Sequence, residues 1–428
     1  MALRQSPPFA GRRASSWHRR TGRASGSSAR CRVRPPASRP EPRSRGAPPR
    51  ESWCALAESI TPVIVAARRT PIGTRGRALA SLSVGELAGP VIRAALADAA
   101  TATGAPVAVA DALLGNCMGP GGNPGRIAAL AAGLDATTPG GTVDRQCGSG
   151  LAAIVDAATA IAAGDRRARV AGGVESASTA PVRSVDGVAY DRAPFAPDGW
   201  PDPDMPRAAE DLAALDGLTR DRQDAHAARS HARATAAQAA GRFDAELVPV
   251  GGAAADDAIG AAAPLLHRLP PLFPGGTLTA GTATRIGDGA AAVILVPGGA
   301  PGLALRASAV VGCDPAFPGV GAGPAIHAAL DRAGATTADV AAFELVEAFA
   351  AQSIAVLARL GLDDDDPRVC ADGGALALGH PWGASGAVAV VRLFSRLVRA
   401  GAAPGTLGVA AASVGGGMGV AAVFEVVS

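Results

Sequence analysis

No lysine occurs in the 428 residues, so all forty basic side chains are arginine. This absence excludes a Walker-type phosphate lysine, a pyridoxal Schiff base and a lysine aldolase. Cysteine is also scarce, because six are spread over the whole chain and none forms a Cys-x-x-Cys pair. The pattern excludes a disulfide framework and a zinc or other metal site, and it favours a reducing compartment such as the cytoplasm.

Long apolar runs are missing as well, since no uninterrupted stretch reaches the roughly 20 residues that span a membrane. We therefore expect no membrane partner. Residues 1–58 contain thirteen Arg and three Glu, a net charge of +10. Because the whole chain has a net charge of +3, the other residues have a net charge of −7. Repeated prolines oppose the amphipathic helix of a transit peptide, and the lack of interleaved aromatic residues disfavours a nucleic-acid partner. We predict a disordered Arg/Pro/Ser-rich extension, or a start codon assigned too far upstream.

The remainder alternates β-favouring runs with stretches of helical period, which is typical of layered α/β domains. Its length exceeds the roughly 250 to 300 residues of a single core. In the first half we predict strands at residues 62–67, 111–115, 169–174, 289–296 and 303–311, and helices at 84–100, 123–132 and 151–161. The last third repeats this order, with helices at 325–333, 348–360 and 381–399 and strands at 341–345, 407–413 and 420–427. The repeated order indicates an internal duplication.

Between about residues 176 and 272 the alternation gives way to proline-rich loops and one long helix near 219–240. We predict an inserted loop domain here. His226 and His231 lie five residues apart, which is not the spacing of an i, i+4 metal pair, so we expect them on a solvated helix face.

One cysteine has a distinctive setting. In residues 144–151, Asp-Arg-Gln-Cys-Gly-Ser-Gly-Leu, Cys147 lies between a short β run and a helix. Free N–H groups and the dipole at a helix N-terminus favour a thiolate, so we expect the Cys147 pKa to lie well below about 8.5. Gly148 and Gly150 leave room for a flat acyl group. A lone cysteine in an alanine-rich segment is more often a packed core residue, so its interpretation as a nucleophile depends on the other motifs.

Four motifs together resemble the active-site motifs of thiolases, in family order and spacing. They are residues 146–151 (Gln-Cys-Gly-Ser-Gly-Leu), 346–350 (Val-Glu-Ala-Phe-Ala), 379–386 (Gly-His-Pro-Trp-Gly-Ala-Ser-Gly) and 415–419 (Gly-Gly-Gly-Met-Gly). The resemblance runs from about residue 60 to the C-terminus. It implies the five-layered α-β-α-β-α thiolase fold, with an N-terminal domain at 59–299 that carries the loop insert and a C-terminal domain at 300–428.

The resemblance also implies an activity. Thiolases are acyl-CoA C-acyltransferases of fatty acid and lipid metabolism that cleave or condense 3-ketoacyl-CoA, usually as homodimers or homotetramers, with CoA or acyl-CoA as substrate and no permanently bound cofactor. By this resemblance Cys147 takes the acyl group and His380 activates the Cys147 thiol. The N–H groups of Cys147 and Gly415 would form an oxyanion hole. The residues that would line the pantetheine channel are Met205, Phe273, Thr284, Ala348 and Phe349.

Two positions depart from the thiolase pattern at the chemistry itself. Ser413 occupies the place of a second cysteine that acts as base, and Val346 replaces an Asn or His that holds a water. Loss of general acid–base help typically costs about 10²- to 10⁴-fold. Cys117 and Cys370 are other cysteines of the motif region, and we interpret both as structural. The family's CoA-binding loop is shortened between Val250 and Leu265 and has no arginine there.

Three hypotheses follow from these departures. The first is a thiolytic or condensing acyl-CoA C-acyltransferase in which another group or a water transfers the proton. The second is a thiolase-fold acyltransferase or decarboxylative condensing enzyme that needs no second-cysteine base. The third is a non-turnover subunit that binds acyl-CoA. We favour the first, because a pure scaffold would need neither Cys147 nor His380.

Overall fold

The computed structural model describes residues 60–260 and 263–428, and every structural statement below concerns these residues. The predicted extension at residues 1–58 lies outside them. In this part of the chain the strands are β1 (Pro62–Arg69), β2 (Gly73–Thr74), β3 (Val109–Gly115), β4 (Gly140–Val143), β5 (Ala168–Ser176), β6 (Arg183–Val185), β7 (Val188–Tyr190), β8 (Gly287–Pro297), β9 (Gly302–Gly312), β10 (Val340–Leu345), β11 (Leu407–Val414) and β12 (Met418–Val427). The helices are α1 (Val84–Thr103), α2 (Pro124–Ala131), α3 (Ser149–Ala162), α4 (Met205–Leu215), α5 (Arg220–Ala239), α6 (Ala322–Ala333), α7 (Ala350–Leu360), α8 (Ala375–Leu378) and α9 (Trp382–Phe394).

Ten strands form one mixed sheet in the order β10-β11-β12-β9-β1-β8-β5-β3-β4, with β2 paired to β8. The first four strands of this order, β10, β11, β12 and β9, come from the C-terminal half, and the others come from the N-terminal half. The two halves are joined where β1 pairs with β9 over only two residue pairs, Val63 with Ala304 and Ile64 with Leu303. The terminal β11 and β12 form the predicted antiparallel hairpin.

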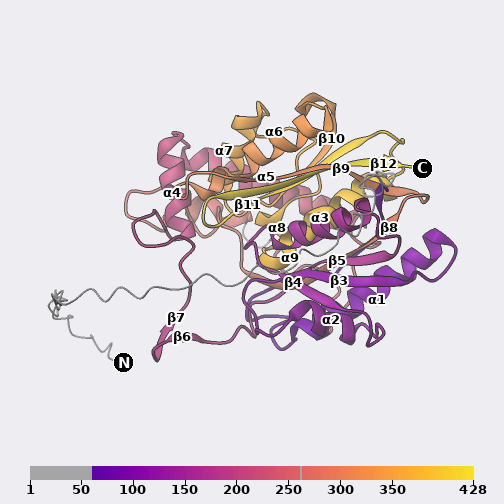
Figure 1. Cartoon of the computed structure of the whole chain (residues 1–428). Coiled ribbons are helices and arrows are strands. Elements are labelled where there is room, and N and C mark those ends of the chain that lie inside the picture. The colour runs from indigo at the N-terminus through magenta and orange to yellow at the C-terminus, as the bar shows by residue number, and fades with distance from the viewer. Residues whose placement is uncertain (1–59, 261–262) are drawn as a thin grey trace, which may run out of the picture. The chain divides into compact units, whose positions relative to one another are not determined.

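Three apolar cores divide the structure into layers (Figure 1). Helices α1 and α2 pack on the β1, β3, β5 and β8 half of the sheet, and α6 and α7 pack on the β9 to β12 half. Helices α3 and α9 lie between the two halves, and the third core forms around them with residues from the facing strands. This is the α-β-α-β-α arrangement that the sequence predicts.

Glycine allows the two central helices to approach each other closely. A Cβ atom on Gly150 of α3 would lie 2.8 Å from the Gly383 carbonyl oxygen, and one on Gly386 of α9 would lie 2.7 Å from the Leu151 nitrogen. Such distances are too short for any side chain. Because Cys147 precedes α3 and His380 precedes α9, this contact determines how near the two residues can be.

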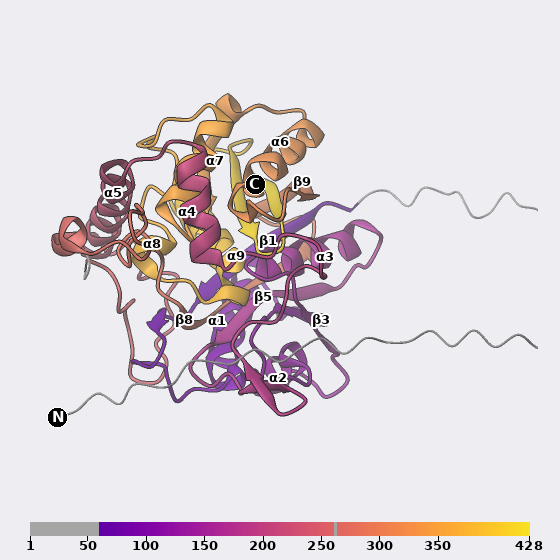
Figure 2. The ribbon, with the colours of Figure 1, turned by 90° about the vertical axis from the view of Figure 1, so that its left-hand side faces the viewer.

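The insert differs from the prediction. It contains α4 and the β6–β7 hairpin in addition to the expected long helix, α5 (Figure 2). Prolines suggested a loop before residue 215, but Pro206 lies in the first turn of α4, where no N–H is needed. At the other end of the chain, α9 ends at Phe394 and residues 395–399 form a π-helical turn.

The predicted solvated histidine face is wrong. His226 and His231 are 5% and 2% exposed, and Nε2 of His226 lies 3.2 Å from the Glu347 carboxylate. The prediction failed because α5 packs against α7 and α8, which no local pattern reveals. In the described residues we find no helix with the length and apolar character needed to cross a bilayer.

Candidate active site

Cys147 lies in a sharp turn between β4 and α3. Gln146 has a φ of 45°, an uncommon value for a residue with a side chain, and this turns the chain directly from strand into helix. Ser149 fixes the turn, because its hydroxyl donates to the Gln146 carbonyl (2.6 Å) and accepts from the Arg145 N–H (2.8 Å). Cys147 is therefore held just before the N-terminus of α3, as the sequence predicts.

His380 reaches Cys147 from the other half of the chain. Nε2 of its imidazole lies 3.2 Å from the Cys147 sulfur, and Nδ1 lies 2.6 Å from the Ser385 hydroxyl. The His380 backbone is anchored next to β8, because its N–H donates to the Arg285 carbonyl at 2.8 Å. A thiol and an imidazole at hydrogen-bond distance are the arrangement required for nucleophilic catalysis with a general base.

The electrostatics of this pair correct one prediction. Cys147 is half-buried, yet burial raises the pKa of its thiol to about 12, and the carboxylates of Glu175 and Asp144 act in the same direction. Burial also lowers the pKa of His380 to about 4. The expected fall of the Cys147 pKa at a helix N-terminus is thus outweighed by loss of solvent. At rest the pair consists of a neutral thiol and a neutral imidazole.

The Gly415 loop lies beside the same turn. Gly148 packs so closely on the end of β11 that a Cβ atom there would lie 2.8 Å from the Val414 side chain, and Gly415 is the next residue. Within residues 60–260 and 263–428, neither the Cys147 N–H nor the Gly415 N–H donates to a backbone carbonyl. Both donors therefore lack a backbone acceptor, and the Cys147 N–H lies against the sulfur of its own side chain. The Phe195 ring of the insert covers Gly415, because a Cβ on that glycine would lie 2.7 Å from it.

Sequence comparison assigns both halves of the chain to one family. The thiolase N-terminal domain model matches residues 62–299, and the thiolase C-terminal domain model matches residues 301–426. The chain belongs to the thiolase family. Members of the family are acyl-CoA C-acyltransferases, and this thiolase is an enzyme of that class.

Individual relatives agree with this assignment. The thiolase is 41% identical to an acetyl-CoA acetyltransferase of Chromobacterium violaceum, over 85% of this chain and 98% of that protein. It is 38% identical to a 3-ketoacyl-CoA thiolase of Klebsiella pneumoniae, with the same coverage. Among solved structures, the Bacillus anthracis acetyl-CoA acetyltransferase aligns with a TM-score of 0.78 at 35% identity, covering 86% of this chain and 99% of that one. The human mitochondrial 3-ketoacyl-CoA thiolase in complex with CoA aligns with a TM-score of 0.77 at 31% identity, covering 86% and 98%.

Ser413 has a structural task in this thiolase. Its hydroxyl donates to the Gly319 carbonyl at 2.6 Å and accepts from the Ala322 N–H at 3.0 Å. Ala322 is the first residue of α6, so the serine satisfies one of the free N–H groups of that helix. A hydroxyl whose proton is already donated to a carbonyl is poorly placed to take a proton from substrate.

Val346 continues the sheet beyond β10. Its N–H donates to the Ala411 carbonyl of β11 at 3.0 Å, and the residue is 4% exposed. The side chain has no hydrogen-bonding atom, so it cannot hold a water. At this position the chain therefore contributes only apolar packing.

The predicted channel residues fall into two groups. Thr284, Ala348 and Phe349 lie together, because the Thr284 N–H donates to the Ala348 carbonyl (3.0 Å) and residue 283 bridges to Phe349. This group adjoins the His380 loop, since Ile286, two residues after Thr284, forms an isolated β-bridge with His380.

Met205 and Phe273 form the second group, within the insert. Met205 begins α4, and the Arg207 guanidinium of that helix lies 5.0 Å from the centre of the Phe273 ring. The structure gives no direct contact between this pair and Cys147. Their role in the channel stays a prediction.

The sequence reasoning assigned no role to Glu175, yet its carboxylate links both halves at the site. It is fully buried and accepts from the N–H groups of Cys117 (3.0 Å), Met118 (3.1 Å) and Gly383 (3.0 Å) and from the Asn116 amide (3.0 Å). Gly383 belongs to the first turn of α9. The stretch at residues 171–176, Ala-Gly-Gly-Val-Glu-Ser, also resembles the thiolase pattern, and that resemblance is the sequence signal for this residue.

Neither of the other two motif-region cysteines contacts the His380 ring. The Cys117 sulfur donates to the Gln146 carbonyl at 3.1 Å, and the Cys370 sulfur donates to the Leu345 carbonyl at 3.4 Å. Burial raises the pKa of both thiols well above the ordinary value. These contacts support the prediction that both are structural.

Proposed function

We propose that this thiolase cleaves or forms 3-ketoacyl-CoA thioesters through an acyl intermediate on Cys147. The observation that carries the proposal is the 3.2 Å contact between the Cys147 sulfur and Nε2 of His380. Because both groups are neutral at rest, the sulfur becomes nucleophilic only as its proton moves to Nε2. The N–H groups of Cys147 and Gly415 would stabilise the oxyanion, and each such donor is worth about 10²- to 10³-fold.

In the cleavage direction, the sulfur attacks the 3-keto carbon while its proton passes to His380. The bond between C2 and C3 then breaks, which leaves an acyl group on Cys147 and a carbanion at C2 of the departing thioester. Since the Ser413 proton is held by the Gly319 carbonyl, we assign the protonation of C2 to His380, which holds the proton taken from Cys147. In the second half-reaction the CoA thiol passes its proton to His380 and its sulfur attacks the acyl-cysteine. The bond between the acyl group and the Cys147 sulfur breaks, the proton returns from His380 to that sulfur, and acyl-CoA leaves.

The substrate and assembly are part of the same proposal. Thr284, Ala348 and Phe349 adjoin the His380 loop and would line the pantetheine channel, with Met205 and Phe273 at its outer part. We also propose a homodimer or homotetramer. The sheet ends in β4, an edge strand, and Ile127 and Leu130 of the adjacent α2 are 41% and 49% exposed, which supports a protein contact on this side.

Intact mass spectrometry after mixing the protein with acetoacetyl-CoA tests the acyl intermediate. We expect an acetyl adduct on the Cys147 peptide, no adduct in Cys147→Ala, and a normal adduct in Cys313→Ala, which removes a half-buried cysteine with no assigned role. Addition of free CoA should discharge the adduct as acetyl-CoA. If no adduct forms in the wild type, the chain is not an acyl-cysteine enzyme.

The Ser413 and Val346 substitutions favour a second candidate function, an acyltransferase or decarboxylative condensing reaction on the same fold. Loss of CO₂ creates the carbanion without removing a proton, so such a reaction needs no second cysteine. An adduct that free CoA cannot discharge would favour this candidate. In that case Ser413→Cys should restore thiolysis, and failure to restore it would show that Ser413 is not the missing base.

A further inference from the structure

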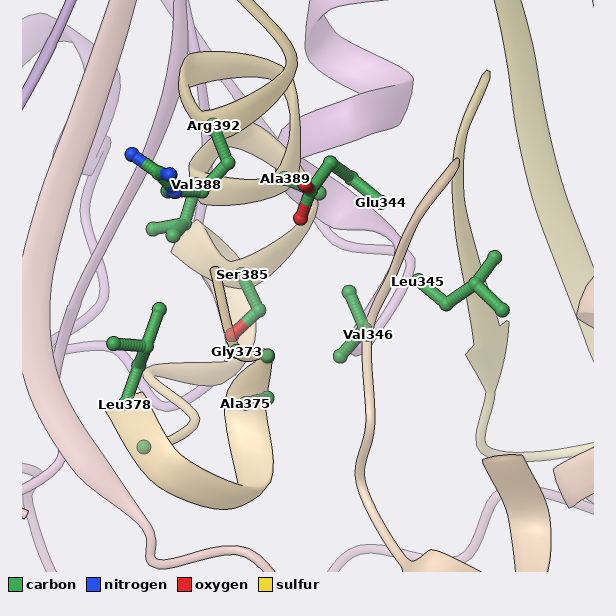
Figure 3. A pocket seen from close by; sticks show the side chains of 12 residues that line it. Glu344, Leu345, Val346, Gly373, Ala375, Leu378, Ser385, Val388, Ala389 and Arg392 are labelled. Atoms are coloured by element: carbon green, nitrogen blue, oxygen red, sulfur yellow. The ribbon is translucent and has the colours of Figure 1, made fainter. Parts of the chain in front are cut away.

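A small cavity lies beyond Ser385, the residue whose hydroxyl meets Nδ1 of His380. The centre of a water molecule could occupy a volume of about 20 Å³ inside it. Glu344, Val346, Ser385, Val388 and Arg392 contribute to its lining (Figure 3). About 10 to 15 Å³ by this measure is enough for one water. The cavity therefore has room for a single water molecule, provided that it also has polar partners.

Arg392 supplies the first partner. The residue is 2% exposed, and its two terminal nitrogens bind the carboxylates of Glu246 and Asp372. Its Nε–H is buried and has no hydrogen-bond acceptor among residues 60–260 and 263–428. Nearly all buried donors in proteins are paired, often with an ordered water. This orphan donor belongs to a side chain that lines the cavity.

Ser385 supplies the second partner. If His380 accepts the thiol proton at Nε2, its Nδ1 already carries a proton and donates it to the Ser385 oxygen. The Ser385 hydroxyl must then donate its own proton elsewhere, and in the described part of the chain no other contact of this oxygen is found. Ser385, Glu344 and Arg392 all line the cavity, and Figure 3 shows Ser385 and Arg392 at different heights of α9 with the Glu344 side chain beside the helix.

Helix geometry explains why this space exists. Ser385, Val388, Ala389 and Arg392 are spaced i, i+3, i+4 and i+7, so they lie along one face of α9. Between the two polar residues this face carries only the short side chains of Val388 and Ala389. Val346, where thiolases usually have a polar residue, closes the opposite side without offering a hydrogen bond.

We propose that this cavity binds one water molecule, which accepts hydrogen bonds from Arg392 Nε–H and the Ser385 hydroxyl and donates to the Glu344 carboxylate. Glu344 is free to accept, since its known partner, Arg396, binds Oε1 at 2.7 Å. Two donors and one acceptor suit a water. An anion would face the Glu344 carboxylate, and an apolar guest would leave the Arg392 Nε–H and the Ser385 proton without an acceptor. The water links His380 to a buried carboxylate through Ser385.

This link makes Ser385 and Glu344 positioning residues, and the inference rests on the proposed acylation of Cys147. No proton leaves Nδ1. When Nε2 receives the thiol proton, the imidazolium is stabilised by a Ser385 oxygen whose lone pairs are held toward Nδ1. Without the water, Ser385 is free to rotate away and the ion pair becomes less favourable.

Two substitutions at Val388 separate the water from simple packing effects. Val388→Leu adds a methylene and should expel the water, whereas Val388→Ala enlarges the cavity and should retain it. We would measure the acylation rate of Cys147 by rapid quench and intact mass from pH 6 to 10, with circular dichroism to confirm folding. We expect Val388→Leu to acylate about 10-fold more slowly near neutral pH. Its alkaline rise should begin about one pH unit lower than in the wild type, because direct loss of the thiol proton overtakes a smaller ion-pair population sooner. Val388→Ala should keep the wild-type profile.

Glu344→Gln should slow acylation in the wild type but have no further effect in Val388→Leu, because both act through the same water. Equal rates in wild type and Val388→Leu, or equal slowing in Val388→Leu and Val388→Ala, would overturn the proposal. A high-resolution crystal structure of the wild type gives an independent test, since an empty cavity would also overturn it. If the wild type forms no adduct at all, the proposed function fails, and the crystal structure alone decides whether the water is present.

Discussion

The pH dependence of Cys147 reactivity follows from the two opposed pKa shifts. A thiol with a pKa of about 12 beside an imidazole with a pKa of about 4 must overcome a gap of eight units to form a thiolate–imidazolium pair. That gap corresponds to about 11 kcal/mol. Charges 3.2 Å apart regain about 5 kcal/mol at an effective dielectric constant of about 20. The N-terminus of α3 adds up to about 2 kcal/mol.

The remaining cost of about 4 kcal/mol leaves the ion pair in roughly one molecule in 10³. Forming it moves a proton within the site, so its population does not change with pH. Direct loss of the thiol proton reaches the same level only near pH 9, about three units below the pKa of 12. We therefore expect alkylation by iodoacetamide to be slow and flat from about pH 5 to pH 9, and to rise about tenfold per unit above that.

His380→Gln supplies the contrast. It removes the ion pair and leaves only direct ionisation, so alkylation at pH 7 should fall about 100-fold and the flat region should disappear. Mass mapping of the Cys147 peptide separates its labelling from that of other cysteines. A sigmoidal wild-type profile with a midpoint below pH 8 and full thiolate reactivity at neutrality would refute the reasoning, because it would mean that the helix terminus outweighs burial.

Two further predictions concern stability. His380 has a pKa near 6.5 in the unfolded chain but about 4 in the folded protein, so the free energy of unfolding should fall as the pH decreases over this interval. The fall should be about 3 kcal/mol larger in the wild type than in His380→Gln. Identical acid profiles of the two proteins in urea titrations would contradict this. Arg69 is fully buried between Glu246 and Asp256, so Arg69→Met should lower the free energy of unfolding by about 3 to 5 kcal/mol, because it leaves buried charges unpaired. Arg167→Met breaks an exposed ion pair with Asp165 and should lower it by less than about 1 kcal/mol. Similar losses in both variants would show that burial does not decide the loss of stability.

The layered fold was readable from the sequence because each layer has its own period. The apolar positions of α1 recur every three to four residues, and its start carries a Ser83–Glu86 capping box. The continuous apolar run of β8 is typical of a strand buried on both faces. The joining of both halves into one sheet was not readable, since it depends on two residue pairs between β1 and β9 that are distant in sequence.

The site was predictable where a motif fixes the backbone and unpredictable where burial sets the chemistry. The sequence placed Cys147 at the N-terminus of a helix, and α3 does begin two residues later, at Ser149. The direction of the Cys147 pKa shift depended on Glu175 and on the surrounding layers, which lie far away in the chain. For the same reason the sequence placed His226 in solvent, although Glu347 on the other half of the molecule holds it in the interior.

The distribution of retained and lost groups constrains the chemistry. Cys147, His380 and the Gly415 loop keep the contacts needed to form an acyl-enzyme, and all three lie where α3, α9 and β11 converge. Ser413 points the other way, into the start of α6, where a thiol would have to replace two good hydrogen bonds. The serine therefore caps α6 and makes no contact with the Cys147–His380 pair. His380 is the only base in contact with the nucleophile among the described residues, so we expect its environment, including Ser385 and the cavity behind it, to govern both half-reactions.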